Sequence, residues 1–171
     1  MTDDHVLGPG LLPTPFTAAE IRESSRAGKT ILLRVEQPDG TSYERVNRFR
    51  DGDDEGATLE QWRTDAPGEL SSRRVTWREL QEHAAFAADR TTVTSETVDL
   101  PLGRLECLRY ETRDEPDAVP ATFWFALAHP GMPVRFDAPA AGGGVIRTTV
   151  LEVEPGQAIP PPSTTSAEPV T

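Results

Sequence analysis

Apolar and polar residues alternate along this chain in short runs, and turn-forming residues separate one run from the next. Alternation with a period of two is typical of β-strands with one buried face. Proline and glycine between the runs supply the backbone conformations of tight hairpins. Links this short favour antiparallel neighbours, because a parallel pair needs a long crossover. Strands are predicted at 30–36, 42–50, 58–64, 70–75, 92–100, 105–112, 121–128, 134–136 and 145–154.

Two segments change to the spacing of an amphipathic helix. Each begins with a threonine that is followed three residues later by a glutamate, which is the pattern of a capping box. These pairs are Thr17 with Glu20 and Thr76 with Glu79. The first helix is predicted to end before Gly28, a residue that commonly terminates helices. Helices are therefore predicted at 18–26 and from 77 to about 87.

The strands and helices together predict one α+β domain. Its main element is a curved, half-barrel-like antiparallel sheet of about eight or nine strands, with the two short helices packed on one face. Residues 1–15 contain several prolines and glycines and are predicted to form an extended N-terminal arm. The single domain is assigned to 16–154. The segment 155–171 is rich in proline, serine and threonine and is predicted to be a disordered tail.

The charge balance and apolar content bear on the class of partner and on the compartment. Lys and Arg number 17 against 28 Asp and Glu, so the acidic chain has a net charge of -11 and would be repelled by nucleic acid. No stretch approaches the roughly 18 consecutive apolar residues of a membrane span. The acidic first residues lack the pattern of a secretory signal, and one cysteine cannot form an internal disulfide. A cytoplasmic location is therefore predicted.

Few residues of the chain have the spacing that catalytic or metal sites need. Cys107 falls on an apolar strand face, two residues after Leu105, where a cysteine is most simply a small buried hydrophobe. No motif supplies the neighbouring base that would activate it as a nucleophile. His5, His83 and His129 do not have the spacing of metal ligands. The sequence therefore predicts no catalytic residue, no metal site and no cofactor.

The segments "ETVDLPLGRLECLRYE" at 96–111 and "ATFWFALAHPGMPVRF" at 121–136 follow a shared order of strand, turn, strand and aromatic strand. In this respect the chain resembles a group of uncharacterised bacterial domains whose curved antiparallel sheet is related in shape to the half-barrel of periplasmic lipoprotein carriers. The resemblance covers about a quarter of the chain. It implies the curved sheet and a concave apolar surface, and it implies no catalytic residue. The matching positions are Val98, Pro101, Gly103, Leu105, Cys107, Tyr110, Trp124, Phe125, Gly131, Val134 and Arg135.

The run from Phe123 to Leu127 is apolar on both strand faces, which predicts a central strand that is covered on both sides. One cover is a helix, and the other is the arm, a protein partner or a ligand. An apolar pocket or interface on the concave side would hold aromatic and sulfur-containing side chains. The candidate surface residues are Trp62, Trp124, Phe125, Met132 and Arg135.

Three classes of function are compatible with this sequence. The preferred hypothesis is a non-enzymatic binding domain whose concave sheet holds an apolar small molecule or a protein partner. A second hypothesis is an enzyme that uses scattered carboxylates with His83 or His129 in the same concavity. A third is a structural subunit that associates with itself through exposed strand edges.

Overall fold

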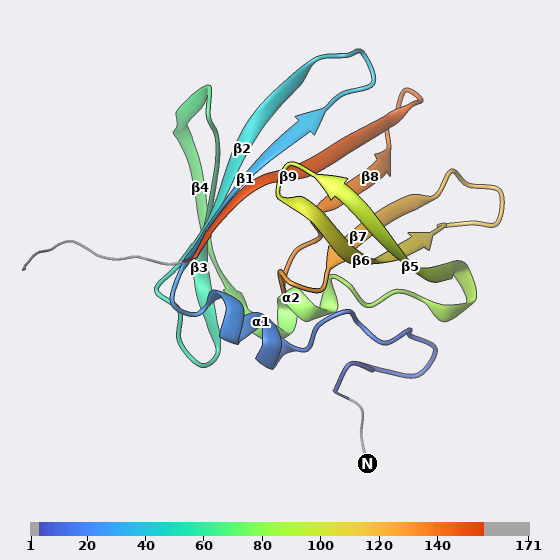
Figure 1. The fold of residues 1–171 in the computed structure, drawn as a ribbon, viewed down its shortest axis with the longest axis horizontal. Coiled ribbons are helices and arrows are strands. Elements are labelled where there is room, and N and C mark those ends of the chain that lie inside the picture. Colours follow the sequence, from blue (N-terminus) through green and yellow to red (C-terminus); the bar gives the residue numbers. More distant parts are fainter. Residues whose placement is uncertain (1–3, 156–171) are drawn as a thin grey trace, which may run out of the picture.

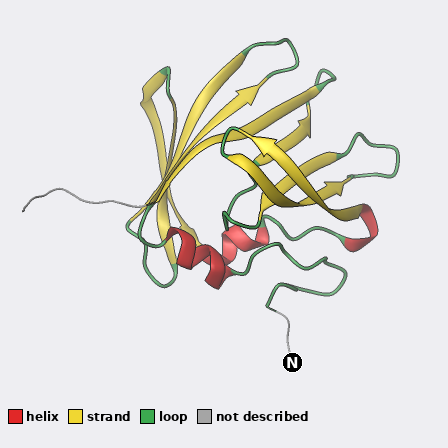
Figure 2. Cartoon of the chain, viewed as in Figure 1, coloured by secondary structure: helices red, strands yellow, loops and turns green. Residues whose placement is uncertain are grey.

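The computed structural model describes residues 4–155 and consists of one nine-stranded antiparallel sheet with two short helices (Figures 1 and 2). The sheet is curved but does not close into a barrel, which confirms the predicted α+β fold class. The helices are α1 (Ala18–Ser25), α2 (Trp77–Glu82) and the short 3-10 helix η1 (Ala88–Arg90). The strands are β1 (Lys29–Glu36), β2 (Ser42–Arg50), β3 (Gly56–Arg63), β4 (Ala66–Thr76), β5 (Thr91–Leu100), β6 (Gly103–Thr112), β7 (Ala121–Ala126), β8 (Arg135–Pro139) and β9 (Val145–Pro155).

The strand order across the sheet is β4-β3-β2-β1-β9-β8-β7-β6-β5. Consecutive strands pair as hairpins everywhere except between β4 and β5, where α2 and η1 form the connection. The first and last strands, β1 and β9, pair with each other in the middle of the sheet. The fold is thus an antiparallel meander whose two free edges are β4 and β5. Its curvature brings strands from both halves of the sheet around one concave space.

The helices α1 and α2 contact each other and lie together at one end of the concave side (Figures 1 and 2). Both predicted capping boxes are present, and each satisfies backbone amides that a helix end leaves free. The buried Gln81 joins the helices to the arm. Its Oε1 accepts from the amide of Ala18 at 2.8 Å, and its Nε2 donates to Thr14 Oγ1 at 3.0 Å and to the carbonyl of Asp4 at 2.8 Å.

The second helix ends at Glu82, about five residues earlier than the sequence predicted. The segment after α2 pairs with the N-terminal arm instead of continuing the helix, because the carbonyl of Phe86 accepts a hydrogen bond from the amide of Leu12 at 2.9 Å. The ring of Phe86 lies 5.3 Å from that of Tyr110 and 4.8 Å from that of Phe123. These tertiary contacts require an extended backbone and override a local preference for helix.

The part of the predicted arm that the structure describes, 4–15, is held against the domain. The hydroxyl of Tyr110 donates to the carbonyl of Pro13 at 2.9 Å. The predicted tail lies outside the described residues except for Pro155, and so do the first three residues of the arm. Within 4–155, no helix has the length and apolar character needed to cross a membrane.

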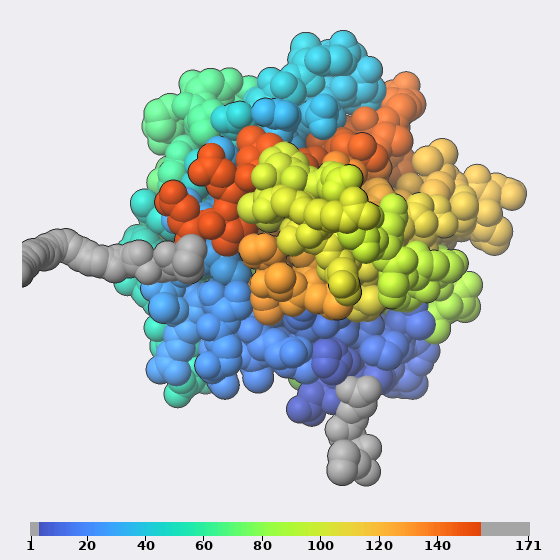
Figure 3. Space-filling view, viewed as in Figure 1, coloured from blue at the N-terminus to red at the C-terminus, as the bar shows by residue number. Residues whose placement is uncertain are grey.

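Both faces of the sheet contribute to the core. On β1, the buried Ile31, Leu33 and Val35 alternate with more exposed side chains, and they define the concave face. The β5–β6 hairpin curls toward β9, so that the two lie side by side (Figure 3). Cys107 on this hairpin is only 2% exposed, as its predicted packing role requires. Burial raises the pKa of its thiol, and the nearby charge of Glu96 adds to the effect.

Gly56 marks a close approach between β3 and β4. A Cβ atom at this buried position would lie 1.9 Å from the carbonyl oxygen of Val75, so the two backbones would have to separate. We expect Gly56→Ala to lower the free energy of unfolding by about 2 to 3 kcal/mol in urea denaturation. Gly68→Ala is the matched control, because nothing lies within 4 Å of its Cβ position. Equal stability of the two variants would contradict the close approach.

Candidate functional site

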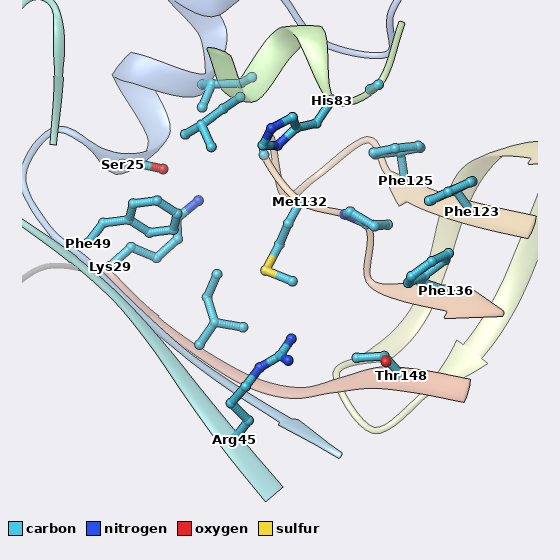
Figure 4. A pocket seen from close by; sticks show the side chains of 16 residues that line it. Ser25, Lys29, Arg45, Phe49, His83, Phe123, Phe125, Met132, Phe136 and Thr148 are labelled. Carbon is cyan, nitrogen blue, oxygen red and sulfur yellow. The ribbon is translucent and has the colours of Figure 1, made fainter. Parts of the chain in front are cut away.

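A cavity of about 340 Å³ lies between the concave face of the sheet and the two helices (Figure 4). Its volume falls within the range of sites that hold small molecules. Most of its lining is apolar, and it comes from strands on both sides of the β1–β9 pair as well as from α1 and α2. The lining residues are Ile21, Ser25, Lys29, Ile31, Arg45, Phe49, Leu80, His83, Ala84, Phe123, Phe125, Gly131, Met132, Pro133, Phe136 and Thr148.

Phenylalanine side chains form one wall of this cavity (Figure 4). Phe123 on β7 pairs directly with Phe136 on β8, and their rings stack with centroids 4.5 Å apart. Phe125 lies two residues further along β7 and therefore faces the same side. Met132, in the loop before β8, projects into the middle of the space in Figure 4. Such a wall favours an apolar or aromatic ligand, because rings provide a large contact area with few rotatable bonds.

Lys29 is a buried cation at the end of the cavity near α1. Its Nζ donates to Ser24 Oγ at 2.6 Å and to the carbonyl of Pro130 at 3.1 Å. Burial lowers the pKa of this lysine from its ordinary value to about 8. His129 lies with Lys29 along a small crevice next to the cavity, and its pKa is lowered by burial and by the charge of Lys29. Near neutral pH Lys29 therefore remains largely charged.

Arg45 is the second cation of the lining, and it approaches the cavity from β2 (Figure 4). Its buried Nε has no hydrogen-bond acceptor, and Arg45 forms no ion pair with any described residue. In the β1–β2 register Lys29 pairs with Phe49 and Arg45 pairs with Leu33. This places the two cations roughly 13 Å apart along the strands, at about 3.3 Å per residue.

The described lining contains no aspartate or glutamate, although the chain as a whole carries a net charge of -11. Lys29, Arg45 and His83 are its ionisable side chains. His83 is exposed and follows directly after α2. A cavity whose walls are apolar and whose ionisable groups are all basic favours ligands of the opposite charge.

The structure does not bring the five candidate surface residues together. Phe125 and Met132 line the cavity. Trp124 and Arg135 form the next cross-strand pair after Phe123 and Phe136, so they lie on the opposite face of the sheet. Trp62 lies on β3 with the Arg48 guanidinium 5.1 Å from the centroid of its ring, and it lines a polar hollow that shares Arg45 with the cavity.

Trp124 is the centre of a polar cluster on that opposite face. Its Nε1 donates to Glu96 Oε1 at 3.0 Å. The guanidinium groups of Arg109, Arg135 and Arg147 lie 5.7, 5.8 and 6.0 Å from the centroid of its ring. These cations cover the second side of the central strand β7, where the sequence allowed an arm, a partner or a ligand. The cluster therefore gives Trp124 a structural environment away from the cavity.

Several lining residues were not among the sequence-based candidates, namely Lys29, Arg45, Phe49, Phe123, Phe136 and Thr148. The sequence contains a signal for some of them. Lys29 is the only lysine of the chain and begins an apolar strand, where a charged side chain is unusual. Arg45 and Phe49 share a strand face by alternation. Nothing local shows that this face meets Phe136, which belongs to a distant hairpin.

Compared with models of known protein families and with curated proteins, the chain matches none. The resemblance of 96–136 to domains shaped like lipoprotein carriers stays a prediction.

Proposed function

We propose that this protein is a non-enzymatic binding domain that holds a small apolar molecule between the concave face of its sheet and the helices α1 and α2. The observation that carries the proposal is the cavity of about 340 Å³ with its phenylalanine wall. Transfer of apolar ligand surface from water into such a space contributes roughly 25 cal/mol per Å². A site that is already formed in the fold also avoids much of the ordering cost of binding.

The lining gives less support to the hypothesis of an enzyme with a carboxylate and a histidine. Among the described residues, no carboxylate lines the cavity beside His83, and His129 lies along the neighbouring crevice. A cytoplasmic location belongs to the same proposal, since the chain has one cysteine and Cys107 is a free, buried thiol. A small molecule is preferred to a protein partner because the apolar residues line an internal space.

A neutral fluorescent probe, N-phenyl-1-naphthylamine, tests this proposal directly. We expect saturable one-to-one binding with a Kd in the micromolar range and a blue-shifted emission. Thr148→Phe places a ring in the cavity from β9, and we expect it to weaken binding about tenfold or more. Thr94→Phe is the matched control, because Thr94 is exposed on the edge strand β5 and does not line the cavity.

Absence of saturable binding, or equal binding by the two variants, would contradict the proposed function. Circular dichroism and melting temperature show whether each variant retains the fold. Native mass spectrometry of the protein purified from its own host then identifies any small molecule that is retained.

A further inference from the structure

We propose that the ligand of this cavity is an amphiphile with one anionic group, which Arg45 binds while the apolar part of the ligand lies against the phenylalanine wall. This inference rests on the proposed function and adds the chemical class of the ligand. It assigns a binding role to Arg45, and it places the polar head of the ligand at Arg45 and the apolar body along Phe123, Phe125 and Phe136.

Arg45 lacks the carboxylate partner that comparable arginines of the same sheet have. Arg48, on the same strand, lies 2.6 Å from Glu60, and Arg147 lies 2.7 Å from Asp137. Arg45 has no such carboxylate among the described residues, and its buried Nε has no acceptor. A buried donor without a partner is costly, and the guanidinium cannot lose its proton to escape that cost.

One other described arginine, Arg135, also has a buried Nε without an acceptor. Its guanidinium lies 5.8 Å from the centroid of the Trp124 ring, so it already has an aromatic partner. Arg135 faces away from the cavity, whereas Arg45 lines it. Of these two arginines, only Arg45 therefore has its guanidinium at the cavity, where the head group of a ligand can reach it (Figure 4).

Arg45 also lies between two different environments. It lines the apolar cavity, and it also lines a polar hollow of about 250 Å³ that includes Gln61 and Ser71. A molecule with an apolar body and a polar head fits this order of surfaces. Glu69 lines the same hollow without forming an ion pair with Arg45. Its carboxylate would repel a head group of high negative charge, which favours a single anionic group.

The remaining cations near this junction already have partners. Arg63 donates two hydrogen bonds to Asp65, at 3.0 and 2.8 Å, and its guanidinium lies 4.0 Å from the centroid of the Tyr43 ring. Lys29 is held by Ser24 and Pro130 at the end of the cavity near α1. Lys29 adds a second positive charge to the lining, but the Arg45 guanidinium is the one without a hydrogen-bond acceptor among the described residues. A carboxylate, phosphate or sulfonate oxygen would satisfy them with charge-assisted hydrogen bonds.

Two fluorescent probes that differ by one sulfonate test this inference. N-phenyl-1-naphthylamine is neutral, and 8-anilinonaphthalene-1-sulfonate has the same rings with one negative charge. We expect the wild-type protein to bind the sulfonate about tenfold more tightly than the neutral probe, because a hydrogen bond to a charged group is worth about that ratio. Arg45→Gln is expected to bring the ratio of the two affinities close to one, whatever its effect on the affinity for the neutral probe.

Matched variants separate a specific contact from a general effect of charge. Arg34→Gln makes the same change in net charge at an exposed position of β1, and it should keep the preference for the sulfonate. Arg45→Lys keeps the charge and should retain part of the preference, and it replaces Arg45→Gln if that variant does not fold. Displacement of the sulfonate probe by laurate and by lauryl phosphate, with lauryl alcohol as the neutral control, distinguishes a carboxylate from a phosphate head.

The outcomes separate this inference from the proposed function. If the neutral probe binds but Arg45→Gln and Arg34→Gln keep an equal preference for the sulfonate, the role of Arg45 is overturned and the proposed function stands. If neither probe binds the wild-type protein in a saturable way, both are overturned. A preference that only the Arg45 variants reduce supports the inference.

Discussion

Lys29→Met is expected to raise the free energy of unfolding at pH 7 by about 2 kcal/mol. Burial lowers the pKa of Lys29 to about 8, against 10.5 for an ordinary lysine, and this difference corresponds to a folding penalty of about 3 kcal/mol for the charged form. The gain is smaller than the penalty, because methionine also loses the hydrogen bonds to Ser24 and Pro130.

The advantage of Lys29→Met should shrink as the pH rises above about 8. Between the folded pKa of about 8 and the unfolded value of 10.5, the unfolded chain binds more protons at Lys29 than the folded chain does. The wild-type protein therefore gains stability with rising pH in this window, whereas the methionine variant does not gain it from this position. Below about pH 8 the lysine is charged in both states, and the full penalty remains.

Urea denaturation of both proteins at pH 7 and at about pH 10 measures this effect. The comparison at each pH cancels other groups that titrate, because both proteins contain them. Arg34→Met is the control, since Arg34 is exposed on the opposite face of β1 and its removal should leave the difference independent of pH. A constant advantage of Lys29→Met across this range would show that Lys29 is not desolvated as the structure indicates.

Trp124→Ala is expected to lower the free energy of unfolding by about 3 to 5 kcal/mol, as truncation of a buried aromatic side chain generally does. The side chain is only 7% exposed, and its removal leaves Glu96 and the surrounding arginines without their shared partner. Binding of the neutral probe in the cavity should nevertheless persist, because Trp124 lies on the opposite face of the sheet from Phe123 and Phe136.

Phe136→Ala provides the comparison on the cavity side. It removes one ring of the stacked pair Phe123 and Phe136, so we expect the affinity for the probe to fall several-fold. Urea denaturation and probe titration at low temperature measure stability and binding for both variants, and Trp124→Phe serves if the alanine variant is unfolded. Loss of probe binding by a folded Trp124 variant would place this residue in the binding site and contradict the assignment of the two faces.

The two cations of the cavity lower the stability of the fold, as expected for side chains that are retained for binding. A buried lysine and an arginine with an unmet donor both oppose folding. Proteins commonly carry such groups where a ligand must be bound. Urea denaturation of Lys29→Met measures the cost of the buried lysine to stability. Titration with the two probes measures the contribution of Arg45 to binding.

The elements of secondary structure that the sequence predicted correctly depend on neighbours along the chain. The two capping boxes fixed where the helices begin, and alternation placed the strand Ser42–Arg50 with both ends as observed. The number of strands and the antiparallel hairpins followed from short turns rich in proline and glycine. Each of these features depends on contacts within a few residues, so the local pattern was sufficient to predict it.

The assembly of the candidate site depends on contacts between segments that are distant in the sequence. The end of α2 was set by the pairing of its following segment with the arm, and not by its own helical spacing. The pairing of β1 with β9 joins the two halves of the open sheet, and the curvature of the sheet brings Phe49 and Arg45 opposite Phe136. Alternation assigned Trp124 and Phe125 to different faces but could not say which face would be hollow. That choice depends on which side the helices cover, and helix packing arises from the whole set of buried surfaces rather than from any one segment.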